Sequence, residues 1–386
     1  MSLYELAILG CATPDERTTL TATLRGMIED FGLAVGTDVR VLDSSNVAGR
    51  DKRAAFAAAY FAGDDHADVE AARALFRSSA PVIPTVGPAG DFARHIPDFL
   101  QSANGLRRRG DDGALVELAS ALLECVGLLR KQRRVFVSYR RTESRAAALQ
   151  LHDLLTARGF DVFLDTHDIR PGDPFQDVLW QRLVDADVMV MLDTPTYFES
   201  RWTRQEIGRA RAKDIHVLRV IWPEHVPSRL TDLAETVYLE PAELEGSDGP
   251  VTRAVADAIV VRVERLRSRA IAARYMAITG KLRADVEKFG GSVEGIGAHR
   301  AVAIRLLDDR KIWAYPVVGV PNAEILNDIA EKARRADQGE TPVLVYDHVG
   351  IRDAWNAHLV WLGEHIRAVR SIKVAEAGWA LAAWEG

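Results

Sequence analysis

The sequence predicts an α/β protein built from parallel sheets, and two observations lead to this class. Short apolar runs alternate with longer segments of helical periodicity along most of the chain. The most apolar run, Val188–Leu192, contains no polar residue at alternate positions. A strand of this kind is buried on both faces, as in a sheet that helices cover on each side. Such sheets bind their ligands at the carboxyl ends of the strands.

Length and composition make several classes of protein less favoured. A chain of 386 residues exceeds one ordinary core, which predicts two or three domains. The formal charge of −6 gives no general attraction to nucleic acid or to anionic membranes. Cys11 and Cys125 lie far apart without metal-ligand spacing, so neither a disulfide framework nor a metal site is predicted. The chain lacks a signal-peptide pattern and any apolar run of the ~18 residues that span a membrane. We therefore expect a cytoplasmic protein.

Residues 1–130 are predicted to form a first small α/β domain. Strands are expected at Glu5–Leu9, Val39–Leu42 and Val82–Val86, and helices at Thr18–Phe31 and Ala114–Leu129. The alanine-rich run Ala54–Ala62 is predicted as a buried helix. Asp43, Asp64 and Asp65 follow such elements, where a receiver domain gathers acidic residues around magnesium, but their spacing favours surface turns. We expect this domain to have a sensing or docking role.

Residues 131–268 show the clearest alternation and are predicted to form the second domain. Strands are expected at Val135–Tyr139, Asp161–Leu164, Val188–Leu192, Val217–Ile221 and Thr236–Leu239. Helices are expected at Ser144–Ala157, Phe175–Ala186, Ser200–Lys213 and about Pro250–Arg267. Parallel strands end at one edge of the sheet, so the residues that follow the first three strands should lie together.

Residues 269–386 are predicted to form a third small α/β domain with a regulatory or sensor role. Its expected elements are helix Ile271–Phe289, a glycine-rich turn over Gly290–Gly297, strand Trp313–Val318, helix Asn322–Arg335, strand Val343–Tyr346, helix Arg352–His365 and a final helical run to Trp384. The turn lacks the lysine and hydroxyl residue of a phosphate-binding loop, so nothing here supports a nucleotide triphosphatase. Asp347 and His348 follow a strand, where a capping aspartate and a surface histidine are favoured over ligand contacts.

The segment Ser200–Glu206 of the second domain carries the most specific local pattern. Trp202 and Glu206 are four residues apart and share a helix face, and Ser200 is suited to cap that helix. An aromatic wall beside one carboxylate suits a flat, cationic ligand linked to a sugar. The alternative is a half-buried anchor tryptophan beside a solvated glutamate. The position of the pair after the third strand favours the ligand.

Three blocks of the second domain together resemble a Toll/interleukin-1 receptor (TIR) domain. They are Val135–Arg141, the loop Asp165–Phe175 and the Trp202–Glu206 spacing, which occur in the order and at the separations of that family. The resemblance covers about residues 132–268 and implies a flavodoxin-like parallel sheet. It also implies that Asp165 lies beside the pocket and that the loop after the second strand is the BB loop. In this loop Arg170 stands where some NAD-cleaving members carry an acidic residue.

Members of the family that are enzymes cleave NAD⁺ with the glutamate that matches Glu206, whereas other members are adaptor surfaces. The chemistry suits one carboxylate, because nicotinamide leaves a pyridinium as a neutral base and no general acid is needed. Ordinary glycosidases need two carboxyl groups because their leaving oxygen must be protonated. Glu206 would hold the ribose hydroxyls and stabilise the developing oxocarbenium charge. His167 in the BB loop is a weaker choice as a base.

The remaining predicted contacts to NAD⁺ come from aromatic and basic side chains. Trp202, Phe136 or Tyr139 offers a π face to nicotinamide or adenine. Strand alternation also makes Phe136 a core residue, opposite its two valine neighbours. Arg140 and Arg141 are suited to bind the diphosphate. The alternative for Arg141 is a pair with Glu143 or exposure to water. Phe175 competes with Pro174 for the aromatic position of the BB loop.

The resemblance therefore implies an NAD⁺ glycohydrolase that releases nicotinamide and either ADP-ribose or a cyclic ADP-ribose. NAD⁺ is the substrate, and no cofactor or metal is expected. In TIR enzymes the BB loop of one subunit completes the site of its neighbour, so self-association would control activity, as in a bacterial defence or stress response. Two alternatives stay open: a non-enzymatic TIR–TIR adaptor module, and an enzyme that transfers nucleosides or nucleotides.

Overall fold

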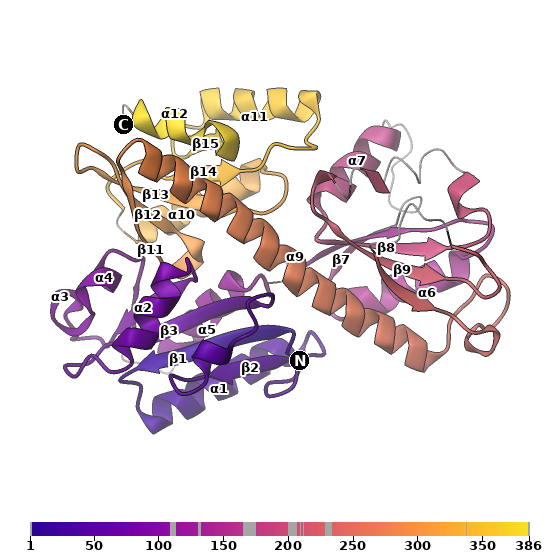
Figure 1. Ribbon diagram of the computed structural model, residues 1–386, viewed down its shortest axis with the longest axis horizontal. Helices are drawn as coiled ribbons and strands as arrows, with labels where there is room; N and C mark the ends of the chain where they lie inside the picture. Colours follow the sequence, from indigo (N-terminus) through magenta and orange to yellow (C-terminus); the bar gives the residue numbers. More distant parts are fainter. Residues whose placement is uncertain are drawn as a thin grey trace. The chain divides into compact units, whose positions relative to one another are not determined.

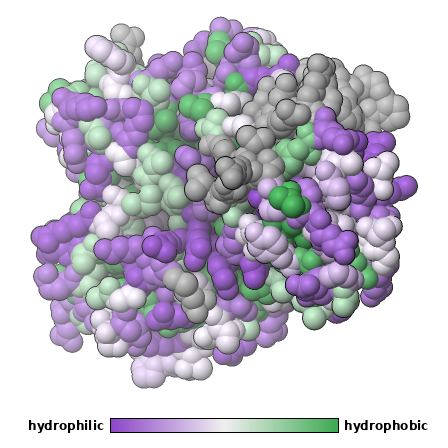
Figure 2. All heavy atoms as spheres, turned by 45° about the vertical axis from the view of Figure 1, so that its right-hand side comes forward, coloured by the Kyte–Doolittle hydropathy of each residue, from purple (hydrophilic) through white to green (hydrophobic). Residues whose placement is uncertain are grey.

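A computed structural model of the chain describes residues 2–108, 113–129, 133–164, 175–199, 207–208, 210, 212–227, 234–336 and 338–384. These residues form two compact units: residues 1–129, 271–348 and 353–386 make up the first, and residues 130–270 and 349–352 the second (Figure 1). On the face drawn in Figure 2, hydrophobic side chains occur in small groups among hydrophilic ones. None of the described helices is both long and apolar enough to span a bilayer. The predicted division into three domains stays a prediction.

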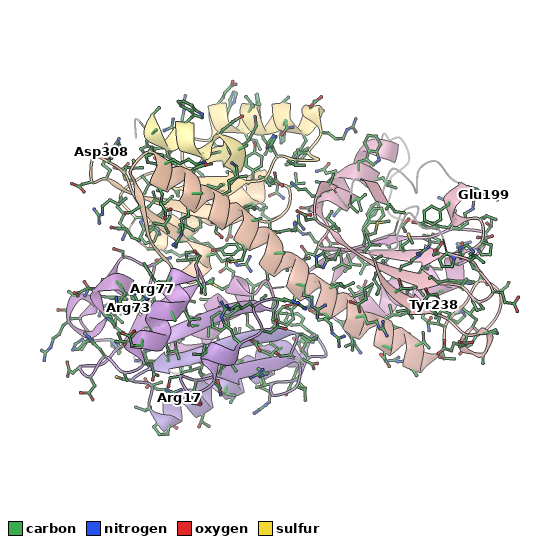
Figure 3. All side chains as sticks on the ribbon, in the orientation of Figure 1. Arg17, Arg73, Arg77, Glu199, Tyr238 and Asp308 are labelled. Carbon is green, nitrogen blue, oxygen red and sulfur yellow. The ribbon has the colours of Figure 1, made fainter. Side chains whose placement is uncertain are left out.

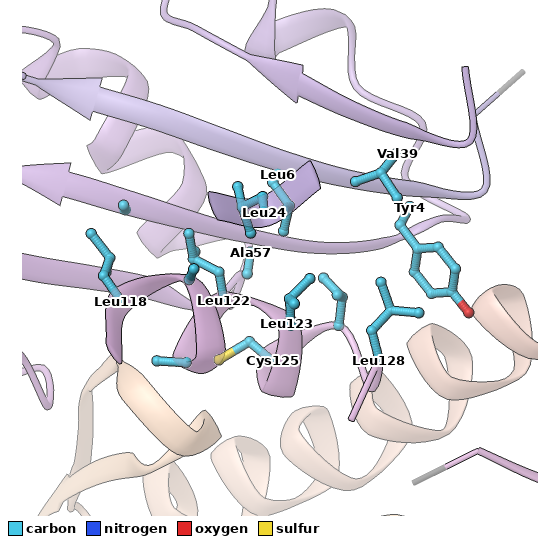
Figure 4. Close-up of a cluster of buried hydrophobic side chains, with 14 of the residues drawn as sticks. Tyr4, Leu6, Leu24, Val39, Ala57, Leu118, Leu122, Leu123, Cys125 and Leu128 are labelled. Atoms are coloured by element: carbon cyan, nitrogen blue, oxygen red, sulfur yellow. The ribbon is translucent and has the colours of Figure 1, made fainter. Parts of the chain in front are cut away.

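The N-terminal part of the first unit is a parallel five-stranded sheet. Its strands lie in the order β2-β1-β3-β4-β5, with bounds β1 Tyr4–Gly10, β2 Val39–Leu42, β3 Ala55–Phe61, β4 Val82–Val86 and β5 Leu106–Arg107. Helices α1 (Pro14–Glu29) and α5 (Ala114–Cys125) pack on one face through the cluster drawn in Figure 4, which contains Leu6, Leu24 and Leu122. Helices α2 (Val69–Arg77), α3 (Phe92–His95) and α4 (Asp98–Gln101) complete this part. An α/β fold is confirmed here.

The predicted helix at Ala54–Ala62 is wrong, because this run forms the central strand β3. All seven residues of β3 are buried between β1 and β4. Phe56 and Tyr60 belong to the core on one face, and Ala57 and Phe61 to the core on the other. Alanine favours helices, but burial on both faces of the sheet overrides that weak preference.

Asp43 and Asp64, which were weighed as receiver-like residues, lie in exposed turns, as the surface-turn interpretation predicts. Asp43 accepts hydrogen bonds from the backbone N–H and the hydroxyl of Ser45, and these bonds lower the pKa of its carboxyl. The Asp64 carboxylate lies 3.4 Å from His95 Nε2. In the described part of the chain, no three histidine, cysteine or acidic side chains are grouped so as to hold a metal ion.

The C-terminal part of the first unit is a mixed five-stranded sheet in the order β11-β12-β13-β14-β15. The strands are β11 Ser292–Ile296, β12 Val302–Arg305, β13 Lys311–Val317, β14 Val343–Tyr346 and β15 Arg370–Lys373, and the helices are α10 Ala323–Arg335, α11 Asp353–His365 and α12 Ala377–Ala382. Strands β11 and β12 are antiparallel, whereas β13, β14 and β15 are parallel. The prediction of a turn over Gly290–Gly297 is wrong for most of that segment, since β11 occupies it. Asp347 and His348 follow β14, and their predicted roles stay predictions.

Within the first unit, a buried carboxylate joins the N-terminal and C-terminal parts. Glu124 of α5 accepts a hydrogen bond from His299 Nδ1 at 2.5 Å and another from Lys332 of α10. Burial opposes ionisation of Glu124, but His299 and Lys332 outweigh it and lower its pKa to about 2. The ionised Glu124 therefore stabilises the first unit.

Replacing Glu124 with glutamine should make the first unit less stable at neutral pH and should reduce its sensitivity to acid. The lowered pKa contributes stability above the ordinary value of 4.5, and this is lost as pH falls toward 2. From the difference between these values we expect Glu124→Gln to lower the free energy of unfolding by ~3 kcal/mol at pH 7. Denaturant unfolding should show a smaller difference between the two proteins at pH 3. An equal difference at both pH values would contradict this role.

The second unit is a parallel five-stranded sheet in the order β10-β9-β8-β6-β7. Its strands are β6 Arg134–Ser138, β7 Asp161–Leu164, β8 Val188–Asp193, β9 His216–Ile221 and β10 Glu235–Tyr238, and its helices include α6 Arg145–Ala157 and α7 Phe175–Asp185. This is the flavodoxin-like order, read from the other edge. All five strands lie within one or two residues of their predicted bounds.

Helix α9 (Arg253–Lys288) is a single helix of 36 residues. Two separate helices were predicted here, and the predicted break near residues 268–270 is wrong. The first half of α9 places Ile259 and Val263 in the core of the second unit, and the second half places Ile278 and Leu282 in the core of the first. The apolar pattern continues across the predicted break, which carries neither glycine nor proline to end the helix.

Charged side chains are buried at the amino-terminal edge of the sheet of the second unit. Arg133 precedes β6, is fully buried, and donates to both oxygens of Glu264 at 3.1 and 2.7 Å. Arg267, one turn along α9 from Glu264, donates through Nε to Asp187 at 3.0 Å. We call Arg133, Asp187, Glu264 and Arg267 the amino-edge network. This network lies at the amino-terminal edge of the sheet, opposite the carboxyl-terminal edge where the sequence predicts the site.

Candidate functional site

The candidate site lies where β6 and β8 end side by side at the carboxyl edge of the second unit's sheet. Strands β6 and β8 are parallel neighbours, with Val137 beside Val190 and Ser138 beside Met191. Helix α6, which follows β6, packs in the core on one face of the sheet. Tyr197 and Ile207, which follow β8, are buried in the core on the other face, so the chain leaves β6 and β8 toward opposite faces. Such a switch point is where open α/β sheets bind ligands.

Residues 135–141 form the first side of this edge. Phe136 is fully buried on β6 and its ring stacks on Phe163 of β7 at 5.4 Å between centroids. This burial favours the core role that strand alternation allows for Phe136. Tyr139 is also buried, whereas Arg140 is half-buried and Arg141 is exposed. Arg140 and Arg141 therefore lie just beyond the strand end, where a ligand at the sheet edge can reach them.

Three contacts tie the exit of β6 to the exit of β8. The Ser138 hydroxyl lies 2.7 Å from the hydroxyl of Tyr197, and both residues are fully buried. The Thr196 N–H donates to Glu143 at 3.1 Å. The Arg140 guanidinium lies 3.9 Å from Glu199, which ends the 3-10 turn η3 (Tyr197–Glu199) and is labelled in Figure 3. The two exits therefore form one surface.

Glu143 is held ionised at this surface. Burial of its carboxyl opposes ionisation, but hydrogen bonds from the Thr194–Thr196 turn outweigh burial and lower the pKa of Glu143. The fixed negative charge of Glu143 attracts the positively charged groups of Arg140 and Arg141, which follow the same strand. Glu143 was not among the predicted site residues, because its partner lies 53 residues further along the chain.

Tyr197→Phe tests the bond between the two exits. Removal of the Tyr197 hydroxyl leaves the buried Ser138 hydroxyl without this partner, and we expect the free energy of unfolding to fall by about 1–2 kcal/mol. Denaturant unfolding measures this loss. The double variant Ser138→Ala/Tyr197→Phe should lose less than the sum of the two single variants. Strictly additive losses would mean that the two hydroxyls do not interact.

A buried cluster of polar side chains also lies at this edge, and the sequence analysis missed it. Asp193, the last residue of β8, accepts hydrogen bonds from Arg219 Nε at 2.7 Å and from His225 Nε2 at 3.1 Å. Arg219 NH2 also lies 2.6 Å from the same Asp193 oxygen as Nε. The one available signal was Arg219 itself, a charged residue inside the apolar run of β9. We call Asp193, Arg219 and His225 the carboxyl-edge cluster.

The remaining predicted site residues lie wholly or partly outside the described residues. Asp165, Trp202 and Glu206 are outside them, as are the BB-loop residues that precede α7. Phe175 begins α7, and its backbone alone is described. Ile207, the residue after Glu206, is buried in the same core cluster as Tyr197 and Phe136. The structure therefore shows the residues on either side of the Glu206 segment, and the contacts of Glu206 itself stay predictions.

Comparison with protein families decides what this unit is. Residues 135–247 match the family model described as TIR domain. The middle of the chain is a TIR domain. The match begins at the second residue of β6 and extends past β10, so it contains every strand of the second unit except the first residue of β6. The flavodoxin-like strand order that the resemblance implied for the TIR domain is present.

Comparison with whole proteins adds little to this assignment. No curated protein matches the chain. Among solved structures, the C-terminal domain of glucosamine-fructose-6-phosphate aminotransferase from Francisella tularensis is 12% identical, over 69% of this chain and 83% of that one, with a TM-score of 0.19. Tagatose-6-phosphate ketose/aldose isomerase from Escherichia coli is 11% identical, over 70% and 83%, with a TM-score of 0.21. TM-scores of this size carry no argument about fold or function.

Proposed function

We propose that the TIR domain is an NAD⁺ glycohydrolase in which Glu206 is the catalytic residue. The observation that supports this proposal is the described turn that leaves β8. This turn is tied to β6 at the switch point of a TIR-domain sheet, and residues 200–206, which lie outside the described residues, follow it in the sequence. In TIR domains that cleave NAD⁺, the matching glutamate performs the reaction.

The proposed reaction breaks the bond between the nicotinamide nitrogen and the ribose carbon. The electron pair of this bond leaves with nicotinamide, which becomes neutral, so no acid has to protonate it. Glu206 holds the ribose hydroxyls and stabilises the positive charge that develops on the ribose. Water then adds to the ribose carbon and releases a proton to solvent. The products are nicotinamide and ADP-ribose, or a cyclic ADP-ribose if the adenine attacks in place of water.

Basic and aromatic side chains supply binding in this proposal. Arg140 and Arg141 follow β6 beyond the strand end and are assigned to the diphosphate, since guanidinium groups bind phosphate oxygens in pairs. Trp202 is assigned to a flat ring of the substrate, and Asp165 and Phe175 to the BB-loop side of the pocket. Tyr139 is buried, so a substrate contact through its ring requires the pocket to extend to the strand end.

Incubation of the purified full chain with NAD⁺ tests this function, with nicotinamide and ADP-ribose separated by chromatography. The expected result is release of both in equal amounts, or of nicotinamide with a cyclic product. A TIR adaptor module would release no nicotinamide. It would instead bind another TIR domain and lose that binding on substitution of Pro171 or Gly172, with no effect of Glu206→Gln. Cleavage of nucleosides in place of NAD⁺ would indicate the transferase alternative.

A further inference from the structure

The carboxyl-edge cluster is a buried ion pair, Asp193 with Arg219, that also binds His225, and it lies at the same edge of the sheet as the proposed site. Asp193 and Arg219 are almost completely buried, with side-chain exposures of 0% and 3%, and His225 retains 13%. One Asp193 oxygen accepts from Arg219 and the other from His225. The carboxylate therefore cannot rotate without breaking an ionic hydrogen bond. Buried ion pairs of this kind often add little stability compared with apolar side chains of similar size. Stability alone therefore does not explain this cluster, and the geometry that it holds is the alternative.

Asp193 also fixes the backbone at the point where the chain leaves β8. The Trp222 N–H, just after β9, donates to the Asp193 carbonyl at 3.0 Å. The next residue, Thr194, begins the turn in which the Tyr197 N–H donates to the Thr194 carbonyl at 3.0 Å. Side chain and backbone of Asp193 are therefore both held by β9 and the loop that follows it, and the turn starts from a fixed position.

The turn that begins at Thr194 precedes the segment that carries Glu206, and residues 200–206 of that segment lie outside the described residues. The turn is anchored at Thr196 by Glu143 and at Tyr197 by Ser138. The chain is anchored again at Ile207, which is buried in the same core cluster as Tyr197. Glu206 precedes the second anchor by one residue in the sequence, and the first anchor, at Thr196 and Tyr197, follows Asp193 by three and four residues.

We propose that Asp193, held by Arg219 and His225, is a positioning residue that sets the path of the chain from β8 to Glu206 and so places the Glu206 carboxylate against the ribose of NAD⁺. This inference rests on the proposed function. A displacement of about 1 Å at a reacting group costs on the order of 100-fold in rate. Loosening of the carboxyl-edge cluster should therefore lower turnover far more than it lowers binding.

Asp193→Asn in the full chain is the first test, with NAD⁺ cleavage followed at saturating and limiting substrate. We expect kcat to fall about 10- to 100-fold and KM to change by less than about threefold, because Arg140 and Arg141 on the other side of the edge are untouched. His225→Leu should show the same pattern, less strongly. His225→Gln keeps an N–H donor for Asp193 and should restore kcat to near the original value.

Glu264→Gln is the matched control, because Glu264 belongs to the amino-edge network. This network is as deeply buried as the carboxyl-edge cluster but lies at the opposite end of the same sheet. Glu264→Gln should lower the thermal unfolding temperature and leave kcat unchanged. If it lowers kcat as much as Asp193→Asn does, general destabilisation accounts for both results and the proposal is wrong.

Hydrogen exchange of the backbone amides over residues 194–208, measured without NAD⁺, separates this proposal from the proposed function. Asp193→Asn should raise exchange in this segment, and Glu264→Gln should not. If the unmodified chain releases no nicotinamide but Asp193→Asn raises exchange here, the proposed activity fails while the control of the segment by Asp193 is supported. Unchanged exchange in Asp193→Asn, or in His225→Leu if Asp193→Asn does not fold, overturns the proposal.

Discussion

Glu206→Gln is expected to abolish NAD⁺ cleavage, with a loss of kcat of about 1,000-fold or more. The amide keeps the shape of the side chain but carries no charge, so it cannot stabilise the oxocarbenium ion that forms as nicotinamide leaves. Nothing else is assigned to replace this charge, because the reaction uses one carboxylate. Nicotinamide release, measured by chromatography at saturating NAD⁺, gives the loss directly.

Two controls make the Glu206→Gln result specific. Glu245→Gln changes an exposed glutamate of the same unit in the same way and should retain full activity. The thermal unfolding temperature of Glu206→Gln should match that of the unmodified chain, since the substitution preserves side-chain volume. Activity in Glu206→Gln close to that of Glu245→Gln would refute the assignment of Glu206, even if the chain cleaves NAD⁺.

Glu264→Leu is expected to have the largest effect on stability, with a fall of about 3–5 kcal/mol in the free energy of unfolding. Glu264 is the shared partner of Arg133, at 2.7 Å, and of Arg267, at 3.6 Å, and both guanidinium groups are fully buried. Leucine fills part of the space but leaves two buried positive charges with one carboxylate fewer. The cost of an uncompensated buried charge exceeds any gain from the apolar side chain.

Denaturant unfolding of the full chain measures the effect of Glu264→Leu. The double variant Arg133→Met/Glu264→Leu removes one of the stranded charges together with its partner. It should be more stable than Glu264→Leu alone, because charge and counter-charge then leave the core together. A double variant that is less stable than the single one would show that burial of charge is not what makes Glu264→Leu costly.

The strands of the TIR domain were predictable because their signal is local. The run Val188–Leu192 is apolar at every position and is buried on both faces, so burial and sequence pattern agree. The run Ala54–Ala62 has the opposite character. Alanine carries a helix preference of its own, and only the neighbouring strands β1 and β4 make this run a strand. The residues of this run alone carry no information about those neighbouring strands.

The site was predictable where it depends on chain order and not where it depends on distant partners. The rule that parallel strands end at one edge correctly brought the exits of β6 and β8 together. The contacts between the exits join residues far apart in sequence, as in Ser138 with Tyr197 and Asp193 with Arg219. A serine or an aspartate at a strand end has many possible partners, and tertiary packing selects one. The roles of Glu206, Trp202 and Asp165 remain predictions from the sequence.

The most direct test of NAD⁺ cleavage by this TIR domain is nicotinamide release by the purified full chain over a wide range of protein concentrations. We predict release that depends on Glu206 and rises more steeply than in proportion to protein, because in TIR enzymes the BB loop of one subunit completes the site of its neighbour and we expect the same here. Release in strict proportion to protein would contradict the role of self-association. No release at any concentration, from a chain that unfolds cooperatively on heating, would contradict the central claim.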